Sequence, residues 1–169
     1  MVHSLELLFD RHTEAALRRI WDDLATADIV SQPPAGRPHV TLVVADGIAD
    51  DVDALLRPVA DQLPLSCTVG PSLFLGPTNA ILARLIVPTA ALLDLHAQVH
   101  RLSHDHLQPG PGPHSVPGRW TPHVTLARRV GDAALRGALN FAGAPAQIDG
   151  SFAGLRRWNG TTRVEYPIG

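Results

Sequence analysis

One five-residue motif occurs twice in the sequence and carries the side chains best suited to chemistry. Pro-His-Val-Thr-Leu spans residues 38–42 and recurs 84 positions later at residues 122–126. Each copy opens an apolar segment with the alternation of a β-strand, in which side chains two residues apart point to the same face. The histidine and threonine of each copy therefore stand side by side, with Cα atoms about 6.5–7 Å apart. The same alternation points Leu42 and Val44 into the core and places Ala127 on the cleft face.

Two matched imidazole–hydroxyl pairs suit phosphoryl transfer without a metal ion. Histidine gains and loses a proton near neutral pH. If both copies face one cleft, His39 and His123 can take a proton from the nucleophile and give one to the leaving oxygen. Thr41 and Thr125 can hold the non-bridging phosphate oxygens. A lone histidine at a strand start more often only satisfies backbone groups, but repetition of the whole unit favours a catalytic pair.

The elements that position these motifs follow the same order in both halves of the chain. Hydrophobic periodicity and turn residues predict strands at 5–9, 39–45, 65–75, 80–87 and 123–127, and helices at 13–25, 50–63, 89–104 and 132–141. Strands at 151–158 and 162–168 then form a closing hairpin around the favoured two-residue turn Asn159–Gly160. Each half thus reads β-α-β-α-β, which together with the repeated motif indicates an internal duplication.

Length, charge and cysteine content limit the remaining classes. The 169 residues suit one two-lobed domain spanning 1–169, and the net charge of −2 with scattered arginines argues against binding along an extended nucleic acid. No apolar run reaches the roughly 18 residues of a membrane span, and the first residues do not resemble a signal peptide. The lone Cys67 excludes an internal disulfide. We therefore expect a cytoplasmic monomer.

The paired motifs resemble those of the two-histidine phosphoesterase superfamily, specifically the 2′-5′ RNA ligase-like proteins that act as RNA 2′,3′-cyclic phosphodiesterases. The segment from Trp120 to Arg128, which contains the second motif, is especially similar to the second motif of that family. The resemblance implies an α+β fold in which two antiparallel sheets flank a central cleft, with helices on the outside.

The resemblance also implies an activity. It is the hydrolysis of a 2′,3′-cyclic phosphodiester at an RNA terminus or in a small cyclic nucleotide, without a metal or another cofactor, and with reversible 2′-5′ RNA ligation as a related reaction. In such enzymes the histidine of the first motif is usually the acid for the departing 2′-oxygen, and the histidine of the second motif is the base for water. These roles fall on His39 and His123, although the near-symmetry of the site makes them exchangeable.

Further substrate contacts are expected from arginines and aromatic residues. Arg84, on the strand that opens the second half, and Arg128, just after the second motif, are candidates to neutralise phosphate. A base needs an aromatic or arginine platform, for which Trp120 and Phe9 are the candidates. The simpler alternatives are that the arginines are exposed solubilising groups and that the aromatic residues belong to the core.

Two other functional classes remain open. His96, His100 and His104 share one stripe of the helix at 89–104, and such spacing can bind a transition metal. We interpret them instead as a partly exposed polar face, because apolar residues already define the buried seam and no glutamate completes a metal motif. The second alternative is a noncatalytic module that binds nucleotides or RNA ends.

Connections rich in proline and glycine precede both motifs, at residues 31–38 and 107–119. The second cannot form regular helix or strand, and loops of this length are often lids or binding loops. Because it leads directly to His123, we expect it to act as a lid over the cleft, with a passive connector as the alternative.

Overall fold

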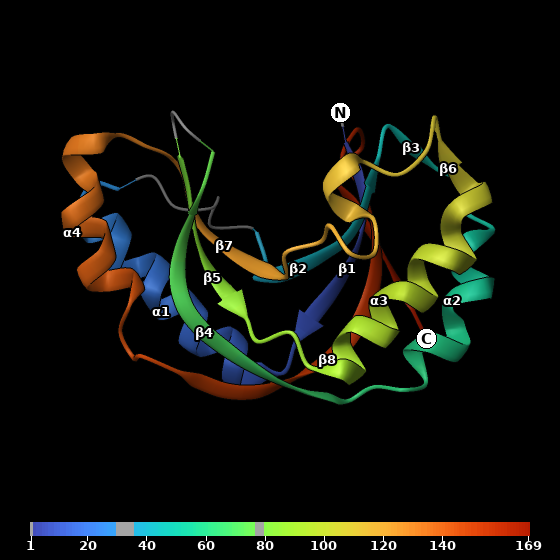
Figure 1. Cartoon of the computed structure of the whole chain (residues 1–169), viewed down its shortest axis with the longest axis horizontal. Coiled ribbons are helices and arrows are strands. Elements are labelled where there is room, and N and C mark those ends of the chain that lie inside the picture. Colours follow the sequence, from blue (N-terminus) through green and yellow to red (C-terminus); the bar gives the residue numbers. More distant parts are fainter. Residues whose placement is uncertain (1, 30–35, 77–79) are drawn as a thin grey trace.

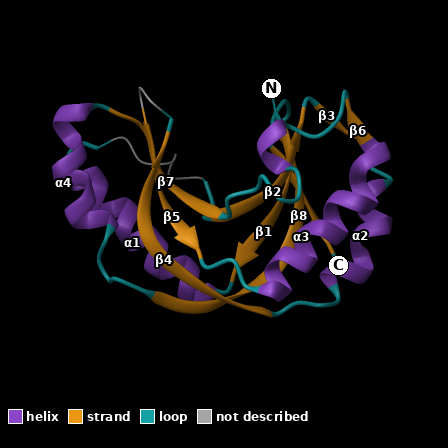
Figure 2. Cartoon of the chain, viewed as in Figure 1, coloured by secondary structure: helices purple, strands orange, loops and turns teal. Residues whose placement is uncertain are grey.

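The computed structural model describes residues 2–29, 36–76 and 80–169 and shows an α+β fold with helices outside a large sheet (Figures 1 and 2). The first half contains β1 (His3–Phe9), α1 (Arg11–Thr26), β2 (His39–Ala45), β3 (Gly47–Ile48), α2 (Val52–Ala60) and β4 (Leu65–Leu75). The second half contains β5 (Ala80–Ile86), α3 (Ala90–Ser103), β6 (Leu107–Gln108), β7 (His123–Val130), α4 (Asp132–Ala142), β8 (Ile148–Asn159) and β9 (Val164–Ile168). The predicted order of both halves is confirmed. Most of the connection at 31–38 lies outside the described residues.

The strand pairing shows the duplication. Seven antiparallel strands lie in the order β1-β2-β7-β5-β4-β8-β9, and β8 also pairs with β1. The strand that follows the second long helix of each half pairs with the first strand of the other half, since β4 pairs with β5 and β8 with β1. The two expected sheets are therefore hydrogen-bonded into one curved sheet, through β2 with β7 and β4 with β8.

The helices form two outer pairs that combine both halves. α1 packs on α4 at one side of the molecule, and α2 packs on α3 at the other (Figure 1). Each lobe therefore takes one helix from each half. Buried apolar residues of both halves form one core cluster, to which β2 and β7 contribute Val40, Leu42, Val124 and Leu126. None of the described helices has the length and apolar character needed to cross a membrane.

Helix starts follow from local hydrogen bonds. The Asp10 carboxylate accepts hydrogen bonds from His12 N and Thr13 N at the start of α1 and from Ser151 N of β8. Burial opposes ionisation of Asp10, but the hydrogen bonds from Thr13 and Ser151 outweigh it and hold the pKa of the carboxyl well below its usual value. Thr89 caps α3, because its Oγ1 accepts a hydrogen bond from Leu92 N at 3.2 Å.

Three predictions of local structure differ from the structure. The closing hairpin has a four-residue loop, since Asn159 pairs with Val164, and the Asn159 side chain accepts hydrogen bonds from Thr161 N and Thr162 N. The segment 107–119 is not irregular throughout, because β6 pairs with β3 and residues Pro113–Ser115 form a 3₁₀ turn. α2 is also shorter than the predicted helix at 50–63.

Candidate functional site

The same β-bulge lies at the last residue of both motifs. Between β1 and β2, Leu5 pairs with Val43 and Glu6 with Thr41, so Leu42 is the extra residue. Between β5 and β7, the pairs of Leu82 with Ala127 and Ala83 with Thr125 leave Leu126 as the extra residue. Leu42 and Leu126 are 84 positions apart, like the motifs themselves. The bulge is therefore part of the repeated unit.

A bulge reverses the alternation of side chains beyond it. Val44 and Arg128 consequently line the cavity described below, although strict alternation predicted Val44 in the core. Ala127 is fully buried, so its predicted place on the cleft face is wrong. Alternation counted along the sequence cannot detect an extra residue that only the partner strand defines.

The two motifs meet where β2 and β7 pair. Val40 is the partner of Val124 in this antiparallel pair. One step to either side, the register sets His39 opposite Thr125 and Thr41 opposite His123. All four side chains are half-buried and project from the same face of the sheet, where opposite Cβ atoms are about 4.5–5.5 Å apart.

Both histidines are oriented by the same hydrogen bond. Nδ1 of His39 lies 2.7 Å from the carbonyl oxygen of Arg37, and Nδ1 of His123 lies 2.7 Å from that of Thr121. Because a carbonyl oxygen only accepts, Nδ1 carries the hydrogen in both rings. Nε2 is thus the atom that each ring presents for proton transfer.

A buried carboxylate distinguishes the first half. Glu6 Oε1 lies 3.5 Å from Nε2 of His39, and the side chain of Glu6 is only 3% exposed. Arg156 binds Glu6 Oε2 at 2.6 Å, and Ser4 Oγ donates to Glu6 Oε1 at 2.5 Å. Ala83 occupies the equivalent position in the second half, opposite the motif threonine. Of the two motif histidines, His39 alone has a carboxylate partner among the described residues. Sequence reasoning missed this partner because Glu6 lies far from either motif.

The surroundings of His123 favour its neutral form. Burial lowers the pKa of the His123 imidazole, and the hydrogen bond to the Thr121 carbonyl raises it in part. The charges of Arg128 and His39 lower the pKa further. Arg128 reaches this position because of the bulge in β7. The two histidines, alike in sequence, thus differ in their nearest charged neighbours, which are Glu6 for His39 and Arg128 for His123.

A cavity of about 610 Å³ opens beside the first motif. His39 and Thr41 line it from β2 and Arg128 from β7, while His123 and Thr125 flank it from β7 without lining it. Its charged lining consists of His39, four arginines at 37, 128, 156 and 163, and two glutamates at 6 and 165. This local excess of positive charge, in a chain of net charge −2, suits a small anionic ligand.

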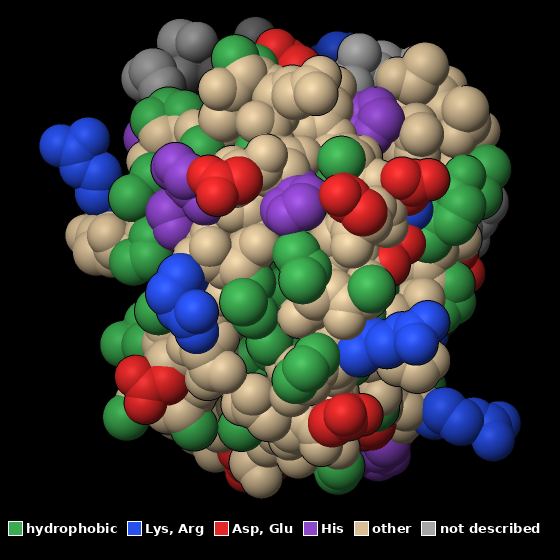
Figure 3. Space-filling model, turned by 90° about the vertical axis from the view of Figure 1, so that its right-hand side faces the viewer, with side chains coloured by type: hydrophobic (Ala, Val, Ile, Leu, Met, Phe, Trp, Pro, Cys, Tyr) green, Lys and Arg blue, Asp and Glu red, His purple; other side chains and the backbone are tan. Residues whose placement is uncertain are grey.

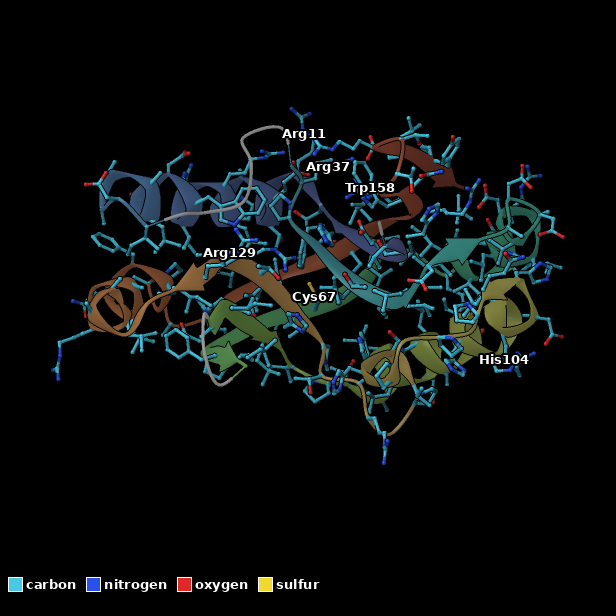
Figure 4. All side chains as sticks on the ribbon, turned by 90° about the horizontal axis from the view of Figure 1, so that it is seen from above. Arg11, Arg37, Cys67, His104, Arg129 and Trp158 are labelled. Carbon is cyan, nitrogen blue, oxygen red and sulfur yellow. The ribbon has the colours of Figure 1, made fainter. Side chains whose placement is uncertain are left out.

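The positive charge is local. On the face formed by α2 and α3, arginines are interspersed with acidic and apolar side chains (Figure 3). Arg37 and Trp158 lie near each other in the view from above, and both line the cavity (Figure 4).

Arg84 is not a phosphate ligand, contrary to the prediction. Its side chain is fully buried, and its guanidinium donates hydrogen bonds to the carbonyl oxygens of Gly70, Ala142 and Ala146. Burial lowers the pKa of this guanidinium. Arg84 joins β5 to β4 and to the C-terminal end of α4, where the helix dipole favours a positive charge.

The predicted base platforms are also structural. Trp120 stacks on His96 with ring centroids 4.0 Å apart, and its Nε1 donates to the Thr41 carbonyl at 2.9 Å. Phe9 is 3% exposed and packs on Phe152. The aromatic residue that does line the cavity is Trp158. The sequence could have indicated Trp158, because it lies two residues after Arg156 on a predicted strand and the two side chains therefore share a face.

The histidine stripe of α3 is not a partly exposed face throughout. His96 is 1% exposed, and its Nε2 lies 3.1 Å and 3.0 Å from the carbonyl oxygens of Leu42 and Ser115. This nitrogen is therefore engaged by the backbone rather than free for a metal. In the ranges 2–29, 36–76 and 80–169, no three His, Cys, Asp or Glu side chains are grouped so as to hold a metal ion.

The connection at 107–119 is hydrogen-bonded to β2. Gly112 N donates to Val44 O at 2.8 Å, and Val44 N donates to Ser115 Oγ at 3.2 Å. A Cβ atom at Gly112 would meet Val44 Cγ2 at 2.6 Å, so this close approach requires glycine. No residue of 107–119, all of them described, lines the cavity, and the lid hypothesis is therefore not supported.

Comparison with known proteins identifies one family and several solved structures with a similar fold. A family model described as the 2′-5′ RNA ligase superfamily matches residues 9–156. No curated protein sequence matches the chain.

Solved structures with the same fold are distant in sequence. Thermus thermophilus TT0787 is 15% identical with a TM-score of 0.61, over 100% of this chain and 96% of that one. E. coli LigT complexed with 3′-AMP is 12% identical with a TM-score of 0.57, over 99% and 94%. The phosphodiesterase domain of MHV ns2 is 14% identical with a TM-score of 0.56, over 99% of each chain.

Proposed function

Because the chain belongs to the 2′-5′ RNA ligase superfamily, we propose that it hydrolyses 2′,3′-cyclic phosphodiesters without a metal ion. The observation that carries this proposal is the register of β2 and β7, which opposes each motif histidine to the threonine of the other motif. The substrates are small cyclic nucleotides or RNA ends. A similar fold is complexed with 3′-AMP in E. coli LigT, and the cavity of about 610 Å³ suits a ligand of that kind.

His123 is the general base. Its lowered pKa keeps the imidazole neutral at pH 7, and the hydrogen bond from Nδ1 to Thr121 leaves Nε2 to accept a proton from water. The water oxygen then forms the new bond to phosphorus.

His39 is the general acid. Glu6 supplies an ionic partner for its imidazolium form, and Nε2 gives its proton to the ribose oxygen as the bond from that oxygen to phosphorus breaks. One proton enters the site with water and one leaves on the product hydroxyl, so the cycle closes when the proton on His123 is exchanged back to His39 through solvent. The same sequence with a ribose 5′-hydroxyl as the nucleophile in place of water, and the 3′-oxygen as the leaving group, corresponds to 2′-5′ ligation.

Thr41, Thr125 and Arg128 stabilise the negative charge on the non-bridging oxygens of the phosphate. The two hydroxyls stand beside the histidines and can donate hydrogen bonds to the non-bridging oxygens, while Arg128 adds a positive charge at the cavity. A module that only binds nucleotides would not need two matched imidazoles, which favours catalysis over the noncatalytic alternative.

The proposal is tested by hydrolysis of nucleoside 2′,3′-cyclic phosphates in EDTA. We expect full activity of the wild type and of His100→Ala. Loss of activity in both cases would favour a metal site on α3 instead. Tight nucleotide binding without turnover of any cyclic phosphodiester would favour the binding module.

A further inference from the structure

The β8–β9 hairpin makes the cleft one-sided. Among the described strands, β9 pairs only with β8. In the first half, β4 corresponds to β8 and is followed directly by β5, so β9 has no counterpart there. The hairpin contributes Arg156, Trp158, Arg163 and Glu165 to the cavity that also holds His39 and Thr41. The internal duplication thus explains the paired motifs, while this added strand provides a surface that only one side of the site possesses.

Strand pairing fixes the place of Trp158 relative to the motif. On β1, Glu6 is opposite Thr41 of β2 and opposite Arg156 of β8. Trp158 follows two residues after Arg156, so it projects from the same face. Two strand spacings across and two residues along place the Cα of Trp158 about 12 Å from that of Thr41. One nucleotide bridges this distance once both side chains are counted, with its phosphate at the motif and its base at Trp158.

The ring of Trp158 is held in place from one side. The Arg156 guanidinium lies 5.3 Å from the ring centroid, and Arg156 is itself bound by Glu6 and Glu165. Trp158 remains half-buried and lines the cavity. An indole fixed in this way loses little freedom when a base stacks on it, which is the contact that single-stranded nucleotides most often make with proteins.

We propose that Trp158 is the stacking platform for the nucleobase of the substrate, and that the substrate class is therefore nucleoside 2′,3′-cyclic phosphates and the terminal nucleotide of RNA, rather than base-free cyclic phosphates. This inference rests on the proposed function for the place of the phosphate. The repeated motifs contact only the phosphate in this proposal. The nucleobase contact comes from the β8–β9 hairpin.

The test compares two substrates with the same five-membered cyclic phosphate ring. For Trp158→Ala we expect the KM for adenosine 2′,3′-cyclic phosphate to rise about tenfold with little change in kcat, because stacking is lost. The KM for glycerol 1,2-cyclic phosphate, which has no base, should stay unchanged. Trp158→Phe should restore much of the loss. Tyr166→Ala is the matched control, since Tyr166 lies on the same hairpin but packs on Arg157 outside the cavity.

An equal rise in KM for both substrates, or no rise for the nucleotide, would overturn the inference. If the wild type turns over neither substrate, the proposed function fails, and the platform is then decided by calorimetric binding of 3′-AMP and of inorganic phosphate. Weaker binding of 3′-AMP alone in Trp158→Ala supports the platform, and equal binding of 3′-AMP to both proteins contradicts it.

Discussion

Glu6 and Ala83 occupy equivalent positions in the two halves, each opposite a motif threonine, yet only Glu6 places a carboxylate 3.5 Å from Nε2 of a motif histidine. In the other half, Arg128 occupies the position equivalent to Val44 and brings a positive charge toward His123. The two halves thus differ at two equivalent pairs of positions. As a result, one motif histidine has an anionic neighbour and the other a cationic one. This difference is the basis on which we propose opposite proton-transfer roles for residues that the motif alone leaves exchangeable.

Replacing Glu6 tests the first half of this asymmetry. Glu6→Gln removes the ionic partner of the His39 imidazolium, so we expect kcat to fall by up to about fivefold. The amide keeps the shape of the side chain, so the loss reports the missing charge. Glu165→Gln is the control, since Glu165 contacts Arg156 but not His39. An equal fall in kcat for Glu6→Gln and for Glu165→Gln would contradict the role.

Replacing Arg128 tests the second half. The lowered pKa of His123 keeps the base unprotonated to below pH 6.5, so the acid limb of kcat/KM should lie below that value. Arg128→Ala removes one of the charges that lower the pKa of His123, so the limb should move to higher pH and activity near pH 6 should fall more than activity at pH 8. Profiles of kcat/KM from pH 5 to 9 measure this. An acid limb at the same pH in the variant would refute the electrostatic coupling.

Arg84 should matter for folding rather than for substrate binding. Arg84→Met leaves buried carbonyl oxygens of Gly70, Ala142 and Ala146 without their donor, and we expect it to lower the free energy of unfolding by about 3 kcal/mol. Urea denaturation measures the loss. KM of the remaining folded protein should be unchanged, and a stable variant with a raised KM would instead restore the predicted phosphate role.

The sequence predicts the duplicated fold well, and the two strands that carry the motif histidines do pair, because repetition and alternation are local properties of the chain. It fails where a neighbouring strand decides the outcome. The bulges after Thr41 and Thr125 are defined by β1 and β5, so alternation misplaces Val44 and Ala127.

Burial and added strands account for the remaining differences. Arg84 and Trp120 look like exposed ligands in the sequence, yet backbone carbonyls from distant segments hold both. Glu6 joins the cavity because β1 lies beside β2. Trp158 joins it because β8 lies beside β1, a pairing between the two ends of the chain.

The central claim is that two histidines transfer protons without a metal. The most direct measurement is the kcat of His39→Ala and of His123→Ala on a nucleoside 2′,3′-cyclic phosphate in EDTA, with circular dichroism to confirm folding. The two-histidine account predicts that each variant loses about 10²- to 10⁴-fold in kcat while the wild type is unaffected by EDTA. Full activity in either folded variant would contradict it.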